Sequence, residues 1–129
     1  MSDLVQPKTR PRSLAITARA GVGPRPAPIE LQTLMSRIMR VYRPLEVWLF
    51  GSRARGDAHP QSDWDLLVIV SDDAPDELLK PLFGWKVQRD SGVYADIVCA
   101  RRSEFFADLA VANTTAREVE HDGILLYAA

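Results

Sequence analysis

The sequence has few of the residues that build disulfide frameworks, histidine metal sites or membrane spans. It contains one cysteine, Cys99, in 129 residues, which excludes an internal disulfide and favours a reducing compartment. Its two histidines, His59 and His121, lie far apart and lack a metal-binding spacing. No apolar run approaches the roughly 18 residues that cross a bilayer. These absences predict a cytoplasmic protein that does not contact the membrane.

Basic charge is concentrated at the N-terminus and scarce elsewhere. Residues 1–28 contain five prolines and five basic residues against one acid, without a sustained apolar period, which predicts a disordered Pro/Arg-rich tail. Residues 29–129 carry eleven basic residues against sixteen acidic ones, so we expect no strong binding to nucleic acid. Their length suits one compact domain.

The most informative stretch is residues 47–70, where two apolar segments flank a small polar loop. Asp63 and Asp65 lead into the second segment, and alternation along a strand points both carboxylates to the same side. Two like charges held this close oppose each other's ionisation unless a cation lies between them. Divalent ions that prefer oxygen ligands fit such a pair, so the sequence predicts a Mg²⁺ site, with Mn²⁺ as the other candidate.

The turn that precedes this pair has the features of a phosphate site. Gly51 allows a close approach of the backbone, and Ser52 opens the first turn of a short helix, whose free N–H groups attract phosphate. Arg53 and Arg55 follow; they can bind phosphates bidentately or lie in solvent. A phosphate site beside a divalent cation predicts binding of a nucleoside triphosphate such as ATP.

The remaining pattern predicts alternating helices and strands. Thr115 and Glu118 fit a capping box for a last short helix, and Gly123 fits its C-cap. The predicted helices cover 29–42 and 76–88 and begin again at Ser103 and Thr115; the predicted strands cover 45–50, 64–70, 93–100 and 124–127. This order predicts an α/β (α+β) domain with a mixed sheet flanked by helices. Trp64, between the two aspartates, should pack on the opposite face of the sheet from them.

Residues 51–70 read GSRARGDAHPQSDWDLLVIV, and this wording resembles the DNA polymerase β-like nucleotidyltransferase superfamily, in particular its minimal nucleotidyltransferase (MNT) branch. The resemblance runs from about residue 29 to the C-terminus. It implies transfer of a nucleoside monophosphate from a triphosphate to an acceptor hydroxyl. It also implies a third catalytic carboxylate on the strand after the crossover helix, where Asp96 is the only acid. A lone carboxylate in an apolar strand is costly to bury without a partner, and either a metal site or an ion pair with Arg101 or Arg102 would supply one.

Three functions remain open at this level. MNT proteins commonly act as antitoxins that nucleotidylate a HEPN ribonuclease toxin, so the resemblance implies a HEPN-type protein partner. A small-molecule enzyme of the antibiotic nucleotidyltransferase kind is the second reading, although such enzymes need a further helical domain around the substrate. A module that neutralises its partner by contact alone is the third. The sequence does not decide between a monomer and a homodimer.

Overall fold

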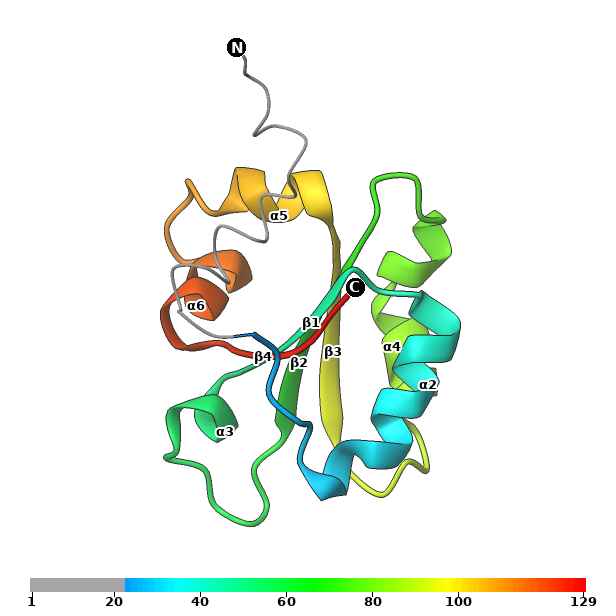
Figure 1. The fold of residues 1–129 in the computed structure, drawn as a ribbon, viewed down its shortest axis with the longest axis vertical. Coiled ribbons are helices and arrows are strands. Elements are labelled where there is room, and N and C mark those ends of the chain that lie inside the picture. The colour runs from blue at the N-terminus through cyan, green and yellow to red at the C-terminus, as the bar shows by residue number, and fades with distance from the viewer. Residues whose placement is uncertain (1–22) are drawn as a thin grey trace.

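The protein is built around a four-stranded sheet that carries helices on both faces (Figure 1), and the computed structural model describes residues 23–129. The sheet order is β3-β2-β1-β4. Strand β1 (Glu46–Phe50) is antiparallel to β2 (Trp64–Val70) and to β4 (Ile124–Ala128), whereas β2 is parallel to β3 (Ala95–Arg101). A mixed sheet flanked by helices confirms the predicted fold class.

The helices form two layers, one on each face of the sheet (Figure 1). Helix α2 (Gln32–Tyr42) and helix α4 (Pro81–Gln88) lie on one face, and α5 (Arg102–Asp108) and α6 (Thr115–Asp122) lie on the other. Short elements complete the described chain: the 3-10 turns η2 (Ile29–Leu31) and η3 (Asp76–Leu79), and helix α3 (Ser52–Arg55).

Each face of the sheet contributes alternate side chains to its own core. On the α2/α4 face, Leu49 and Leu66 pack against apolar residues of α2 such as Ile38. On the α5/α6 face, Trp48 and Leu67 belong to a second cluster. Strand β2 is buried along nearly its whole length, because it is central in the sheet and covered on both sides. The members of the second cluster that come from α5 and α6 are Phe105, Ala116 and Val119.

The structure corrects two local predictions, each for a physical reason. The helix predicted over 76–88 is two elements, because Pro81 occupies the first position of α4 and holds Lys80 in an extended conformation. The cap of α6 is Thr114 rather than Thr115: the Thr114 hydroxyl accepts from the Arg117 N–H at 3.3 Å. The capping box predicted for Glu118 is therefore wrong, although Gly123 does cap the helix at its other end.

The last residues of the expected tail make contacts with the domain. Residues 1–22 lie outside the described part of the chain, but residues 23–28 contact the domain. The N–H of Arg25 donates to the Leu125 carbonyl of β4 at 2.9 Å, and Ala27 packs against the α2/α4 core. Pro24 and Pro26 have no N–H, so Arg25 supplies the one amide of this triplet that can bond to an edge strand. Residues 23–28 of the expected tail therefore contact the domain, and the boundary at residue 28 stays a prediction.

Candidate active site

The turn between β1 and α3 requires glycine. Gly51 has φ 73° and ψ −159°, a backbone region that is essentially restricted to glycine. A Cβ atom at this position would lie 2.2 Å from Asp65 Oδ2 and 3.0 Å from Asp65 Cγ. The backbone at Gly51 therefore lies directly against the Asp65 carboxylate. The sequence predicted that Gly51 allows a ligand to approach the backbone. In the structure, the group that approaches Gly51 closely is the side chain of Asp65, one of the predicted metal-binding acids.

The register of the sheet brings two of the three predicted carboxylates together. Asp65 pairs with Phe50 on β1 and with Asp96 on the parallel strand β3. Directly paired residues on parallel strands project to the same face, so Asp65 and Asp96 share a face of the sheet. Asp63 lies two residues before Asp65, just ahead of the strand. Trp64, between them, is buried in the core on the α2/α4 side, as the alternation predicted.

Asp96 is exposed, so the predicted cost of burying it does not arise. The ion pair with Arg101 that we considered is also wrong, because Arg101 reaches the other end of its strand. There it bonds to Asp76 and to the Ala74 carbonyl, with Glu104 at 3.9 Å. Within residues 23–129, no ion pair to Asp96 is found. Its carboxylate is available to a ligand on the Asp65 side of the sheet.

The electrostatics of the site reflect this crowding of acids. Partial burial raises the pKa of Asp65 above its ordinary value, and the negative charges of Asp96, Asp63 and Glu118 raise it further; only Arg55 opposes them. A raised pKa means that the ionised form of Asp65 is disfavoured where it stands. A cation bound between these carboxylates would reverse that penalty.

The donor set suits a divalent cation in its chemistry. Asp63, Asp65 and Asp96 offer carboxylate oxygens, which Mg²⁺ and Mn²⁺ prefer. The negative charges of Asp63 and Asp96 both raise the pKa of Asp65, so the three carboxylates influence one another. As the side chains stand, no three acidic, histidine or cysteine residues in the described chain meet closely enough to hold an ion. Asp63 and Asp96 are both exposed. The three carboxylates could hold a metal ion only if these side chains turned toward Asp65.

The two arginines of the turn have different roles. Arg53 is fixed to the loop that follows α3: its guanidinium donates to the Ser62 carbonyl at 2.8 Å and the Pro60 carbonyl at 3.2 Å, and it stacks 4.2 Å from the centre of the Trp64 ring. Arg55 instead lies between two carboxylates, with Nε 3.2 Å from Asp57 and Nη1 3.7 Å from Glu118. Arg53 therefore shapes the loop, and Arg55 belongs to the charged side of the site.

Ser52 begins α3 directly after Gly51, and its carbonyl accepts from the N–H groups of Gly56 and Asp57. This closes the short helix after one turn. Two N–H groups of this turn, those of Ala54 and Arg55, already donate to the Gly51 carbonyl, so at most the N–H groups of Ser52 and Arg53 remain for a phosphate.

Glu118 is the one residue near the carboxylates that the sequence analysis assigned elsewhere. It was expected to cap α6, but Thr114 takes that role, and Glu118 instead reaches Arg55 and lies close enough to raise the pKa of Asp65. The signal that could have found it is the neighbouring threonine: with Thr114 as N-cap, Glu118 falls outside the capping position.

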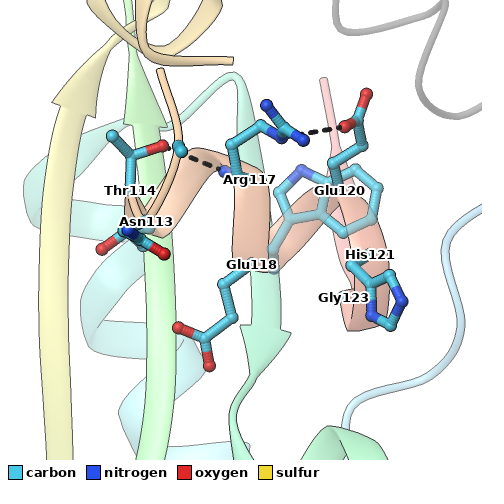
Figure 2. Close-up of a pocket in the computed structure, with 10 residues that line it drawn as sticks. Asn113, Thr114, Arg117, Glu118, Glu120, His121 and Gly123 are labelled. Carbon is cyan, nitrogen blue, oxygen red and sulfur yellow. Dashed lines mark hydrogen bonds and ion pairs between the residues drawn. The ribbon is translucent and has the colours of Figure 1, made fainter. Parts of the chain in front are cut away.

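A cavity of about 940 Å³ opens over α6, and Glu118 forms part of its lining (Figure 2). Figure 2 shows the Glu118 side chain directed away from Arg117 and Glu120, which pair with each other at 3.9 Å. The cavity adjoins Trp48, which belongs to the α5/α6 face. It therefore lies on the same side of the sheet as Asp65.

A family model for the nucleotidyltransferase domain matches residues 33–122. The chain belongs to this family. The match spans most of the chain and contains Gly51, Asp65 and Asp96, the residues that the register brings together. Nucleotidyl transfer is the chemistry that this family performs. No curated protein matches its sequence.

Solved structures share the fold. One is a crystal structure of a toxin–antitoxin with AMP-PNP, 23% identical, with a TM-score of 0.50, where 74% of this chain aligns with 72% of that one. Another is a putative nucleotidyltransferase from Sulfolobus solfataricus, 22% identical, also with a TM-score of 0.50, where 74% of each chain is covered. These likenesses establish the architecture. No helix in residues 23–129 of the nucleotidyltransferase is long and apolar enough to cross a membrane.

Proposed function

We propose that this nucleotidyltransferase moves AMP from ATP to a hydroxyl group on a partner protein, using Mg²⁺ or Mn²⁺, and acts in the cytoplasm as an MNT-type antitoxin on a HEPN-type toxin. The observation that carries the proposal is the register that pairs Asp65 with Asp96 beneath the Gly51 turn. Acids that can hold a divalent ion, next to a turn whose N–H groups can meet a phosphate, are what nucleotidyl transfer needs, and this supports the proposal.

The reaction forms one bond and breaks one bond at the α-phosphorus of ATP. The oxygen of the acceptor hydroxyl attacks that phosphorus, the bond to the bridging oxygen of the β-phosphate breaks, and pyrophosphate leaves. The hydroxyl proton passes to a carboxylate at the site and then to solvent. Asp96 is the exposed candidate for accepting this proton, because it projects beside Asp65 and has no ion-pair partner in the described chain.

The divalent ion would be held by Asp63, Asp65 and Asp96. When bound, it supplies positive charge that neutralises the triphosphate and lowers the pKa of the acceptor hydroxyl. Gly51 and Ser52 would place the start of α3 against the phosphates. Without the ion, the three carboxylates repel a triphosphate.

A protein acceptor suits the shape and charge of the site. Asp63 and Asp96 are exposed, so the site is open to an acceptor that brings its own surface. The acidic excess of residues 29–129 disfavours a polyanionic acceptor such as RNA. A relative of this fold has been crystallised as a toxin–antitoxin with AMP-PNP, which supports both the nucleotide and the kind of partner.

The first test is calorimetric titration with ATP. We expect binding with Mg²⁺ or Mn²⁺ and a loss of at least about tenfold in affinity in EDTA, because unscreened carboxylates repel the phosphates. Asp63→Asn and Asp65→Asn should abolish transfer without unfolding the protein, whereas Asp108→Asn, an exposed acid on α5, should behave as wild type. Equal affinity for ATP with and without the metal would refute metal dependence.

The second test identifies the acceptor. The protein is incubated with labelled ATP, Mg²⁺ and the product of the neighbouring gene, and each component is searched by mass spectrometry for an added AMP group. We expect the modification on a tyrosine or serine of that protein. Label on an aminoglycoside would indicate a small-molecule enzyme, and label on an RNA end would indicate an RNA substrate. A stable complex without transfer would indicate neutralisation by contact.

A further inference from the structure

The turn between α4 and β3 exposes two aromatic side chains to solvent. Tyr94, directly before β3, is 81% exposed, and Trp85 on α4 is 52% exposed. Both line one hollow of about 390 Å³ together with Arg89, whose guanidinium lies 5.3 Å from the centre of the Trp85 ring. Tyrosine, tryptophan and arginine are the residue types that contribute most to binding at protein–protein interfaces. We call this hollow, with Trp85, Arg89 and Tyr94, the aromatic surface.

The turn that carries the aromatic surface is tied to the rest of the domain. Arg37 on α2 donates to the carbonyls of Arg89 at 2.6 Å and Asp90 at 3.1 Å. The side chain of Gln88 is buried and accepts from the Ala95 N–H at 3.2 Å, which joins the end of α4 to the start of β3. A surface that is held in place before binding loses less conformational entropy when a partner docks on it.

The aromatic surface lies at the end of the sheet that carries the predicted metal-binding acids. Pairing between β2 and β3 begins just before the strands, where the Trp64 N–H donates to the Tyr94 carbonyl at 2.9 Å. Tyr94 precedes Asp96 by two residues, so their backbones lie about 7 Å apart along the strand. A second hollow, of about 720 Å³, leads from Tyr94 to Ser62 and Trp64. A protein held on the aromatic surface would therefore have its own side chains close to the proposed active site.

The charge around the aromatic surface is opposite in sign to that of the rest of the domain. Residues 31–43 and 81–94, which include α2, α4 and the turn, contain five basic residues and one acid. The remainder of residues 29–129 contains six basic residues and fifteen acids. The exposed members of the basic group are Arg40, Arg43, Lys86 and Arg89. This distribution favours a partner with an acidic surface.

Two other occupants suit the surface less well. Two copies of the chain that met symmetrically through it would set like charges against each other. A nucleic acid would meet the exposed acids Asp63 and Asp96 at the same end of the sheet, and they would repel its phosphates. An acidic protein that also offers an apolar side chain matches both the charge and the hollow.

We propose that the acceptor protein docks on the aromatic surface, with an acidic patch facing Lys86 and Arg89 and one apolar side chain in the hollow between Trp85 and Tyr94. The inference rests on the proposed function and deepens it, because it assigns the surface that selects the acceptor. These residues hold the acceptor and take no part in the chemistry. Their loss should therefore raise the KM for the acceptor and leave kcat unchanged.

The experiment measures two quantities with the purified product of the neighbouring gene: its affinity by calorimetry, and the rate of AMP transfer to it. Tyr94→Ala and Trp85→Ala should each weaken its binding by about tenfold or more, as for a central interface aromatic. Arg89→Glu should do the same and make the affinity less dependent on salt. ATP binding and kcat should stay within about twofold of the wild type in all three variants.

Controls separate the loss of a docking surface from general damage. Val111→Ala truncates another exposed apolar residue, 53% exposed and located in the α5–α6 loop, and should leave acceptor binding unchanged. Tyr94→Phe and Trp85→Phe keep an aromatic ring and should retain most of the affinity, which also serves if a truncated variant melts early. Each variant is compared with the wild type by its melting temperature.

Three results would overturn the inference: acceptor binding that is unchanged in Tyr94→Ala and Trp85→Ala, an equal loss in Val111→Ala, or a loss of ATP binding together with acceptor binding. Variants that break up a dimer of this chain or release RNA, with the acceptor still bound, would also overturn it. All of these leave the proposed function standing, because the wild type still modifies the acceptor. A wild type that neither binds nor modifies the neighbouring protein would overturn both.

Discussion

Replacing Gly51 with alanine tests the closest contact in the site, the approach of the β1–α3 turn to Asp65. Two separate costs are expected. A residue with a side chain is strained in the backbone conformation of Gly51, and this strain lowers the free energy of unfolding by about 1–3 kcal/mol. The new Cβ would also lie 2.2 Å from Asp65 Oδ2, so the carboxylate must move by about 1 Å to reach an ordinary contact.

Forced overlap of this kind typically costs about 1–3 kcal/mol, so the two costs together should lower the free energy of unfolding of Gly51→Ala by about 2–6 kcal/mol. For a domain of about 100 residues, this lowers the melting temperature by roughly 10–30 °C. The same change should abolish nucleotide binding, because it displaces Asp65 from its pairing with Asp96.

Thermal melting of four proteins separates the two costs: wild type, Gly51→Ala, Asp65→Ala and the double variant. Removing the Asp65 carboxylate removes the overlap but not the backbone strain, so Gly51→Ala should cost about 1–3 kcal/mol less in the Asp65→Ala background. Gly56→Ala is the matched control. Gly56 also has a positive φ, 86°, but nothing lies within 4 Å of its added Cβ, so only a backbone cost of about 1–2 kcal/mol is expected.

Equal losses in the two backgrounds would show that Asp65 does not lie against Gly51. A loss no larger than that of Gly56→Ala would show the same. Either result would remove the geometric basis on which the carboxylates and the turn have been assigned to one site.

Deletion of residues 1–28 should lower the melting temperature by several degrees more than deletion of 1–22, because the longer deletion also removes the Arg25 hydrogen bond and the packing of Ala27; the two truncated proteins are compared by calorimetry. Asp65→Asn should stabilise the metal-free protein most at neutral pH. Because the folded state raises the pKa of Asp65, the stability of the wild type falls as the pH rises from about 4 through that raised pKa. Melting in EDTA at about pH 3 and pH 7 should therefore show a larger difference in melting temperature between Asp65→Asn and the wild type at pH 7. Thr114→Ala should lower the free energy of unfolding by about 0.5–2 kcal/mol because it removes the N-cap of α6, whereas Thr115→Ala should lower it much less. If chemical denaturation gave the reverse order, Thr115 and Glu118 would form the capping box after all.

The order of helices and strands was predictable because it depends on local patterns. Apolar periodicity located α2, and alternation across the Asp63–Asp65 pair gave the correct face for Trp64. Local signals also misled where two neighbours compete. Thr114 and Thr115 are chemically equal candidates for a cap, and only the path of the preceding loop selects Thr114.

The long-range features could not be predicted in the same way. The pairing of Asp65 with Asp96 depends on the register of two strands that a helix separates. The contact between Arg55 and Glu118 depends on how α6 packs across the sheet. Likewise, the proline-rich composition predicted disorder for residues 23–28. Their contact with β4 depends on an edge strand about 100 residues further along the chain, which composition does not reveal. Each of these results from tertiary packing, which a local pattern does not contain.

The proline-flanked segment on β4 has a consequence for self-association. An uncovered edge strand presents a row of unpaired amides and carbonyls, and a second molecule can add to it and offer a new edge in turn. Here the Arg25 N–H takes one of these groups, the Leu125 carbonyl, and the flanking Pro24 and Pro26 have no N–H to offer to an incoming strand. Proline at an edge is one of the ways in which natural sheets limit edge-to-edge pairing. The segment therefore makes this part of the β4 edge a poorer template for a second molecule.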